Sequence, residues 1–459
     1  MDLIQPKHAY ADDASQGHIY TNTSLRTIGA LLAEKGVDIC LHDENIRPTD
    51  SLSSNIVGMN LVGAPYIPVA IQTIKRLRKQ FGDELVFVLG GQPLTQKENK
   101  YGKVLGLDEG QFKYLFGKGV YNGMKEGVLE SLLNIKNISE GHTISLISMY
   151  EKLSDSDFLS YFSTETSLYV SEGCKFNCDF CAALKGQAEQ YRESEMLWKD
   201  LNYIVNRLQK LGKNTVSMYM SNLDVFQSAQ QLGEFANMIL QIKACHPGFT
   251  FSLRGLACTK SFIHLDKKYP RVLDKLALAG FNNVGYGVDG IGPEIWKGIK
   301  KPQNNEKEIL DAIRLTKEKY AITPELLMVF GHAGIDTEKS LKDAYDFAEA
   351  MVQKYGAVPR PYVAKSFVPG NDGRTKSDFQ ESIKLIIENP ILFNNLEYSA
   401  LASKITHPDD SFRNLVNEYY LKMCDLPGNT TLPILPYDIG DSKEVLASKK
   451  RENSGKFDR

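Results

Sequence analysis

The sequence lacks a long apolar run and lacks an excess of charge of either sign. No run approaches the ~20 apolar residues that a membrane-spanning helix needs, so we expect no membrane partner. Lysine and arginine number 54 against 56 acidic residues. A chain without a global positive field is not expected to bind nucleic acid. The first residues also lack the pattern of a secretory signal peptide, which favours a reduced, cytoplasmic location.

Cysteine is scarce but unevenly placed. Of seven cysteines, Cys174, Cys178 and Cys181 fall in one short segment. An iron–sulfur cube is normally held by one thiolate per iron, so three cysteines leave a fourth iron without a protein ligand. That open iron is where chemistry could occur. The apolar segment 168–170 predicts a short strand before the cysteines, and α/β folds place their sites at strand ends.

A structural zinc site and a disulfide are the two other interpretations of the three cysteines. A structural zinc site needs four ligands, usually as two separated pairs, and no second Cys-x-x-Cys or His-x-x-His follows them. A disulfide would leave one thiol unpaired. The remaining cysteines are scattered singly and are read as small buried hydrophobic residues: Cys40, Cys245, Cys258 and Cys424.

Strand-like and helix-like apolar patterns alternate along most of the chain. Residues 1–20 are left without an assigned fold, and strands are then predicted at 37–41, 56–61 and 85–89. Strands that alternate with helices indicate a parallel α/β layer. After the cysteines, five more strands alternate with helices, predicted at 215–220, 249–253, 283–288, 325–330 and 360–367. With the strand before the cysteines they make six strand–helix units.

The predicted fold class is therefore α/β, with a Rossmann-like parallel α/β domain first, a partial (β/α)6 barrel next and a helical region last. We place the first domain at 1–136, a linker at 137–166, the barrel at 167–375 and the helical region at 376–440. Residues 441–459 are charged and nearly free of aromatic residues, which predicts a disordered tail. Ligands of such folds bind at the C-terminal ends of the strands.

The spacing Cys-x3-Cys-x2-Cys, with Phe180 directly before the last cysteine, resembles the motif of the radical S-adenosylmethionine (SAM) superfamily. The resemblance implies a 4Fe-4S cluster on Cys174, Cys178 and Cys181 whose open iron is chelated by SAM, with Phe180 among the SAM contacts. Electron transfer from the cluster then cleaves SAM to a 5′-deoxyadenosyl radical. The resemblance also implies an electron donor such as flavodoxin or ferredoxin, and a small-molecule or peptide substrate.

Further SAM contacts follow from the same resemblance at the strand ends. Asn222 and Asp224 stand where many members have a Gly-Gly-Glu that holds the SAM amino group, and a turn that caps the next helix is the alternative for them. Arg254 offers a planar fork to the SAM carboxylate, or else forms a salt bridge. Asp289 matches an acidic residue that binds the ribose, but its shorter reach leaves that contact water-mediated or lost.

The order of segments from Ser24 to Leu133 resembles the N-terminal cobalamin-binding domain of one large radical SAM subfamily. The residues implied as corrin contacts follow predicted strands and are small or turn-forming: Asn60, Gly63, Gly90, Gly91 and Gln92. No Asp-x-His-x-x-Gly motif is present, which argues against a histidine on cobalt. A domain that only supports the barrel is the alternative, because fold alone does not establish a site.

The sequence thus predicts a radical SAM enzyme that uses cobalamin to methylate an unactivated carbon, with no catalytic residue assigned. A cobalamin-independent epimerase, lyase or rearrangement enzyme is the first alternative. A methylthiotransferase acting on RNA has less support, because Cys40 is the only cysteine before Cys174. A non-enzymatic metal-binding module is the alternative from another class.

Overall fold

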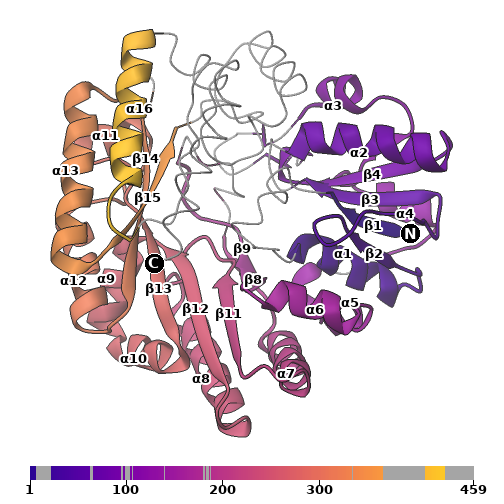
Figure 1. Cartoon of the computed structure of the whole chain (residues 1–459), viewed down its shortest axis with the longest axis horizontal. Coiled ribbons are helices and arrows are strands. Elements are labelled where there is room, and N and C mark those ends of the chain that lie inside the picture. Colours follow the sequence, from indigo (N-terminus) through magenta and orange to yellow (C-terminus); the bar gives the residue numbers. More distant parts are fainter. Residues whose placement is uncertain are drawn as a thin grey trace, which may run out of the picture.

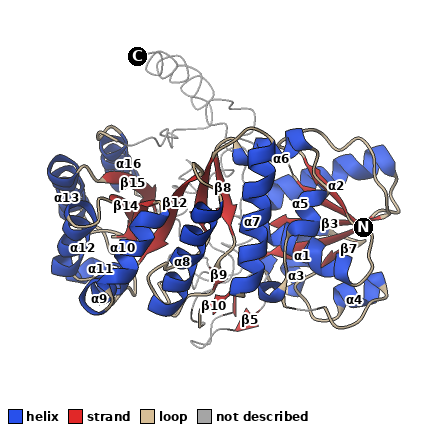
Figure 2. Cartoon of the chain, turned by 90° about the horizontal axis from the view of Figure 1, so that it is seen from below, coloured by secondary structure: helices blue, strands red, loops and turns tan. Residues whose placement is uncertain are grey.

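Two parallel sheets flanked by helices organise the chain in a computed structural model (Figure 1). The structure describes residues 1–6, 22–61, 66–94, 97–98, 104–105, 107–138, 140–178, 181, 186, 188–332, 334–364 and 409–428. The view in Figure 2 separates the N-terminal sheet from the larger second sheet. The predicted α/β fold class is confirmed.

The N-terminal sheet has five parallel strands in the order β2-β1-β3-β4-β7. Its strands are β1 (Asp2–Gln5), β2 (Cys40–Asp43), β3 (Ile56–Leu61), β4 (Val86–Gly91) and β7 (Val120–Asn122). Helices on both faces explain why β3 is buried along nearly its whole length. This strand order is that of a doubly wound fold. Ligands of such folds bind at the carboxyl edge of the sheet, at the switch point between β1 and β3 where the strand order reverses.

The two faces of this sheet pack into different cores. On one face the apolar side chains of α1 and α4 join residues of the second domain, and on the other face α2 and α3 form a separate core. The connecting elements are α1 (Thr23–Glu34), α2 (Tyr66–Phe81), η1 (Gln92–Leu94), a hairpin of β5 (Lys97–Glu98) and β6 (Val104–Leu105), α3 (Glu109–Phe116) and α4 (Val128–Leu133).

Strand β1 corrects the sequence prediction, which assigned no element to the first twenty residues. It lies between β2 and β3 and forms one side of the switch point. Only Leu3 and Ile4 are apolar in it, too few to show a period. Its Asp2 carboxylate accepts hydrogen bonds from the backbone N–H of Ser54 (2.8 Å) and from Nε2 of His42 (2.8 Å). Burial alone would raise the pKa of Asp2, but these partners lower it.

The second sheet has six parallel strands in the order β15-β14-β13-β12-β11-β8, as the six predicted units require. They are β8 (Glu165–Leu168), β11 (Thr215–Met220), β12 (Thr250–Ala257), β13 (Phe281–Gly287), β14 (Thr323–Phe330) and β15 (Val358–Val363). Burial alternates along β12, because one face meets helices and the other lines the barrel interior. The strand expected at 168–170 lies earlier, and β12 runs four residues past its predicted end at Leu253.

Helices cover the outer face of the partial barrel. They are α7 (Ser194–Lys210), α8 (Ala229–Cys245), α9 (Thr259–Lys268), α10 (Pro270–Ala279), α11 (Pro293–Gly298), α12 (Glu306–Glu318) and α13 (Glu338–Tyr355). A further helix, α16 (Asp410–Cys424), packs against β15 and α13. The rest of the predicted helical region and the predicted tail lie outside the described residues. Among the described helices, none has the length and apolar character to cross a bilayer.

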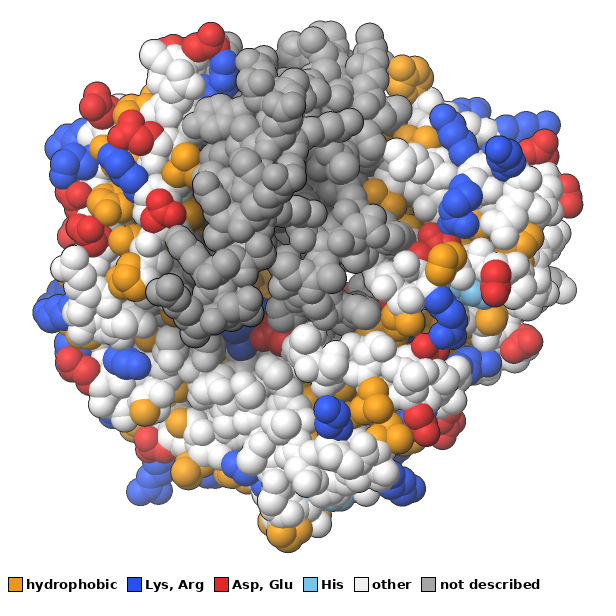
Figure 3. Space-filling view, in the orientation of Figure 1, with side chains coloured by type: hydrophobic (Ala, Val, Ile, Leu, Met, Phe, Trp, Pro, Cys, Tyr) orange, Lys and Arg blue, Asp and Glu red, His pale blue; other side chains and the backbone are white. Residues whose placement is uncertain are grey.

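The segment between the two sheets is structured and shares their core. It holds η2 (Gly141–Thr143), α5 (Ile147–Glu151) and α6 (Asp155–Phe162). One continuous apolar cluster runs from Leu3 and Leu32 through Met149 and Phe158 to Leu201 on α7. The N-terminal domain is therefore packed onto the barrel. On the face in Figure 3, the described basic and acidic side chains are mixed, without a broad area of one sign.

A buried ion pair fastens this connecting segment to the barrel. Arg192 donates to Asp200 on α7 (2.5 Å) and to the carbonyl of Ile144 (2.7 Å), and both charged side chains are 1% exposed. The Asp200 carboxylate also accepts from the Ser145 hydroxyl (2.6 Å) and the Leu146 N–H (2.9 Å). Burial raises the pKa of Asp200, and Arg192 opposes that effect.

Replacing Arg192 with leucine should destabilise the fold by about 3–5 kcal/mol, because Asp200 would stay buried without its counter-charge. Urea unfolding at pH 7 measures this loss. The deficit should shrink as the pH falls, since protonation of Asp200 removes the unpaired charge. In the control Lys199→Ala, which breaks the exposed Lys199–Glu195 pair, stability should change by less than about 1 kcal/mol. Equal losses in the two variants would contradict the role of the buried pair.

Candidate active site

The three clustered cysteines lie in a loop that begins just after β8 and is closed at its base by a short hairpin. Strand β9 (Ser171–Glu172) pairs antiparallel with β10 (Gln190–Tyr191). Gly173 has a φ of +92°, and a side chain there would lie 2.7 Å from the carbonyl oxygen of Ala188. Only glycine fits this close approach. The loop is therefore held at both ends, at the C-terminal edge of the barrel sheet.

The thiols themselves are partly or fully buried. Cys178 is buried, while Cys174 and Cys181 are half-buried, and the N–H of Cys181 donates to the carbonyl of Cys178 (3.2 Å). Burial raises the pKa of Cys174 to about 11 and also raises that of Cys178, where Lys301 and Gln303 oppose the shift. Such thiols stay protonated until a metal displaces the protons.

A compact group of possible metal ligands lies elsewhere in the chain, on the first two strands. Among the described residues, one group of three metal-ligating side chains lies within 4.8 Å of one another, and it is Asp2, Cys40 and His42 rather than the three loop cysteines. That group lies on β1 and β2. The Asp2 carboxylate in it already accepts hydrogen bonds from the backbone N–H groups of Ser53 and Ser54.

The other four cysteines, all among the described residues, form no disulfide bond. Cys424 is buried as expected, but Cys245 is exposed, which corrects the prediction for that residue. It ends α8, where the side chain leaves the packed face of the helix. Cys258 is half-buried, and burial raises its pKa to about 11.

A polar segment between α11 and α12 lies against the cysteine loop, and the sequence interpretation missed it. Gln303 donates from Nε2 to Sγ of Cys178 (3.4 Å). Lys301 is buried and forms an ion pair with Asp289, and its Nζ donates to the carbonyl of Gly287 (2.7 Å). Burial alone would lower the pKa of Lys301, but Asp289 and Cys178 raise it, so the ammonium is retained. The composition of this segment alone looks like an ordinary loop.

Asp289 lies two residues after β13, in a left-handed conformation (φ +51°). Its carboxylate pairs with Lys301 and accepts from the N–H of Val329 (3.2 Å). These contacts fix the exit of β13 to β14 and to the segment after α11. The expected contact with the SAM ribose stays a prediction, and the carboxylate has internal partners that the sequence did not reveal.

Asn222 and Asp224 follow β11 as predicted and are both buried. The Asp224 carboxylate accepts from the Ser261 hydroxyl (2.6 Å) and the Cys258 N–H (3.1 Å), so it caps the start of α9. The next helix, α8, is capped by Ser228 instead, and Asp224 contacts the start of α9. Burial raises the pKa of Asp224, and these hydrogen bonds oppose the shift. The amide oxygen of Asn222 has no hydrogen-bond partner among the described residues.

Arg254 differs most from expectation. Because β12 continues to Ala257, Arg254 lies inside the strand, and its guanidinium faces the barrel interior. It donates to both carboxylate oxygens of Glu165 (2.6 and 2.8 Å) and pairs with Glu325 at 3.5 Å. It also lies over the Tyr219 ring, 4.8 Å from the centroid. The salt-bridge alternative describes this arginine, and its predicted pairing with the SAM carboxylate has no support from its position.

The sequence interpretation also missed Glu189, a further acidic residue at the mouth of the barrel, which is the C-terminal edge of the barrel sheet. Its carboxylate accepts hydrogen bonds from the hydroxyls of Ser171 (2.5 Å) and Tyr191 and from the amide of Gln227 (2.9 Å). Burial raises the pKa of Glu189, and the nearby Asp224 adds to that shift. The sequence signal was weak, because Glu189 lies beyond the cysteine motif.

Three amides around the cysteines offer unused acceptors. The side-chain oxygens of Asn177, Asn222 and Gln303 are buried and have no hydrogen-bond partner among the described residues. Buried polar atoms without partners are rare in folded proteins, and each one points to an absent ligand or water. An ammonium group donates up to three hydrogen bonds. Each of these oxygens can accept a hydrogen bond from a donor such as the SAM amino group. Phe180 lies outside the described residues.

The predicted corrin contacts lie at the carboxyl edge of the N-terminal sheet. Asn60 donates from Nδ2 to Oδ1 of Asn22 (3.1 Å), the N-cap of α1. Gly91 has a φ of +109°, and a side chain there would overlap the carbonyl of Leu61. Asn60 and Gly91 thus each have a role in the fold itself. At Gly90, an added Cβ would meet only Met124 Sδ, at 3.7 Å, among the described residues. Gly63 and the Gln92 side chain lie outside the described residues.

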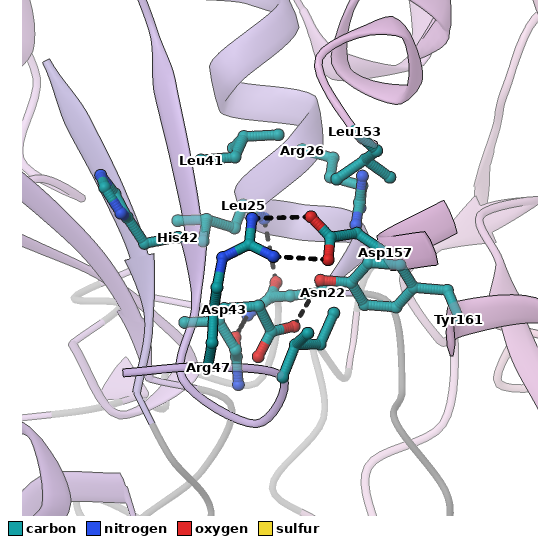
Figure 4. A pocket seen from close by; sticks show the side chains of 12 residues that line it. Asn22, Leu25, Arg26, Leu41, His42, Asp43, Arg47, Leu153, Asp157 and Tyr161 are labelled. Carbon is teal, nitrogen blue, oxygen red and sulfur yellow. Dashed lines mark hydrogen bonds and ion pairs between the residues drawn. The ribbon is translucent and has the colours of Figure 1, made fainter. Parts of the chain in front are cut away.

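Figure 4 shows a hollow, open to solvent, that is lined by polar and apolar side chains from β1, β2, α1 and α6. Arg47 donates to both oxygens of Asp157 (2.6 and 2.7 Å), and the Tyr161 hydroxyl donates to Asp43 (2.5 Å). The His42 ring is turned away from this hollow. These bonds tie the ends of the first strands to α6, the helix directly before β8.

The sequence model of the radical SAM superfamily matches residues 168–348, which span β8 to α13 and include all three clustered cysteines. This part of the chain is therefore similar to the superfamily whose members use a 4Fe-4S cluster and SAM. No curated protein matches the chain.

Solved structures extend the likeness to the N-terminal domain. The cobalamin-dependent SAM radical enzyme OxsB, with aqua-cobalamin and SAM bound, matches 86% of this chain with a TM-score of 0.57 and 15% identity. The apo form of OxsB matches 98% of this chain with a TM-score of 0.56 and 15% identity. The chain spans 55% and 61% of those two chains. At this identity the likeness shows the shared two-domain fold.

Cys178→Ala should lower the bound iron and labile sulfide well below the about four of each per chain that a 4Fe-4S cluster requires. It should also abolish reductive SAM cleavage to 5′-deoxyadenosine. Anaerobic reconstitution followed by iron, sulfide and product assays measures both. Cys245→Ala, which removes an exposed cysteine on α8, should retain both. A Cys178→Ala protein with full iron content would contradict the cluster assignment and favour a non-enzymatic module.

Proposed function

We propose that this chain is a cobalamin-dependent radical SAM enzyme that methylates an unactivated carbon. The observation that carries the proposal is the pairing of a doubly wound N-terminal domain with a radical SAM barrel, the arrangement also found in OxsB. The titles of the OxsB structures give cobalamin and SAM as its ligands. The substrate is a small molecule or a peptide, and flavodoxin or ferredoxin delivers the electron.

In this proposal the cluster and SAM bind at the C-terminal edge of the barrel sheet, and cobalamin binds at the carboxyl edge of the N-terminal sheet. When bound, the cluster supplies the electron that cleaves SAM, and cobalamin carries the methyl group that is transferred. Cys174, Cys178 and Cys181 hold the cluster, and the amide oxygens of Asn177 and Asn222 accept hydrogen bonds from the SAM ammonium. The hairpin of β9 and β10 and the buried segment after α11 hold the loop in place and limit the access of water.

The carboxyl edge of the N-terminal sheet supports cobalamin binding by its topology and by Gly90, where an added Cβ would meet only Met124 among the described residues. The domain's packing onto the barrel through a common core supports a fixed position for a methyl donor.

A cobalamin-independent radical SAM enzyme, such as an epimerase, lyase or rearrangement enzyme, is the second candidate. The observation that favours it is that Asn60 and Gly91 serve the fold itself. In that case the N-terminal domain supports the barrel without binding a corrin.

Reconstitution with hydroxocobalamin should give a protein that retains corrin absorbance after gel filtration. Gly90→Val should fold normally, because the new side chain meets only Met124, but its added atoms should weaken corrin binding by at least about tenfold through steric overlap. Its iron content should match the unaltered protein. Absence of corrin binding by the unaltered protein would refute the methylase proposal and leave the second candidate.

A further inference from the structure

We propose that Gln303 tunes the iron–sulfur cluster by donating a hydrogen bond to the sulfur of Cys178, which raises the reduction potential of the cluster. Gln303 is a positioning residue in this proposal, since it acts through a cluster ligand. The inference rests on the cluster part of the proposed function and is independent of cobalamin.

The geometry of the contact is that of a buried N–H to sulfur hydrogen bond. Nε2 of Gln303 lies 3.4 Å from Sγ of Cys178, and the two residues are 6% and 9% exposed. A cluster thiolate carries no proton, so the partner that faces it must be a donor. The amide has two such N–H groups at one end. The low exposure keeps water from competing for the sulfur.

The backbone around Gln303 is fixed on both sides. Before it, Lys301 binds the Gly287 carbonyl through Nζ (2.7 Å), and its own N–H donates to the Trp296 carbonyl (2.7 Å). After it, Asn304 donates from Nδ2 to the Val288 carbonyl (2.7 Å). The segment is thus anchored to the exit of β13, and Gln303 needs little additional ordering to reach the sulfur.

The direction of the effect follows from charge. One-electron reduction, with the electron supplied by a flavodoxin- or ferredoxin-type donor, adds a negative charge to the cluster. A hydrogen bond to a cluster sulfur stabilises the more negative state, and such bonds are among the levers that set cluster potentials. The retained ammonium of Lys301, near Cys178, acts in the same direction. Removing the amide should therefore make reduction harder.

Gln303→Met keeps the length and removes the donor. In a redox titration followed by electron paramagnetic resonance, without SAM, its midpoint should lie below that of the unaltered protein. At a fixed solution potential, the ratio of reduced to oxidised cluster should fall about threefold to tenfold, which is the effect of one ordinary hydrogen bond. The matched control is Gln227→Met, a half-buried amide at the same mouth that donates to Glu189 instead of a cysteine, and its midpoint should stay unchanged.

The outcomes separate this inference from the proposed function. An unaltered protein without iron and sulfide would refute the cluster itself. A cluster present in both proteins with equal midpoints, or an equal shift in Gln227→Met, would overturn the role of Gln303. If Gln303→Met fails to assemble a cluster, pulsed resonance on unaltered protein labelled with ¹⁵N in the glutamine amide decides. A nitrogen coupling to the reduced cluster supports the bond, and its absence refutes it.

Discussion

Parallel hydrogen bonding between the six barrel strands determines where this chain can carry out chemistry. The six strands of this sheet, β8 and β11 to β15, run in the same direction, so each one delivers its following loop to the same edge. The cysteine loop after β8, Asp224 after β11 and Asp289 after β13 meet there, although more than a hundred residues separate the first from the last. The Arg254–Glu165 pair belongs instead to the interior below that edge.

The same edge brings buried charges together, and each has an internal partner. Asp289 pairs with Lys301, and Asp224 accepts from the Cys258 N–H and the Ser261 hydroxyl at the start of α9. An unpaired buried carboxylate would be costly in itself. It would also place negative charge beside three thiolates. Pairing these acids therefore serves the stability of the mouth and limits the field that opposes cluster reduction.

Much of the fold was predictable from the sequence, because long periodic segments carry a strong signal. The six barrel strands and strand β3 follow from apolar runs. The assignment of the three clustered cysteines as cluster ligands stays a prediction from their spacing. Strand β1 could not be predicted, since two apolar residues show no period. Arg254 was misplaced because burial, not local sequence, lengthens β12. Gln303 was missed because its contact with Cys178 joins residues 125 positions apart.

The charged residues that the sequence offered as ligand contacts mostly hold the site together, and that division follows from electrostatics. A ligand that carries an ammonium group can be bound by neutral amide oxygens as well as by carboxylates. Amides do so without adding negative charge near a cluster that must accept an electron. The acids of this mouth are accordingly engaged with protein donors, whereas the oxygens of Asn177, Asn222 and Gln303 remain without partners among the described residues. Gln303 joins the two requirements, because its N–H faces the sulfur of Cys178 and its oxygen stays available as an acceptor.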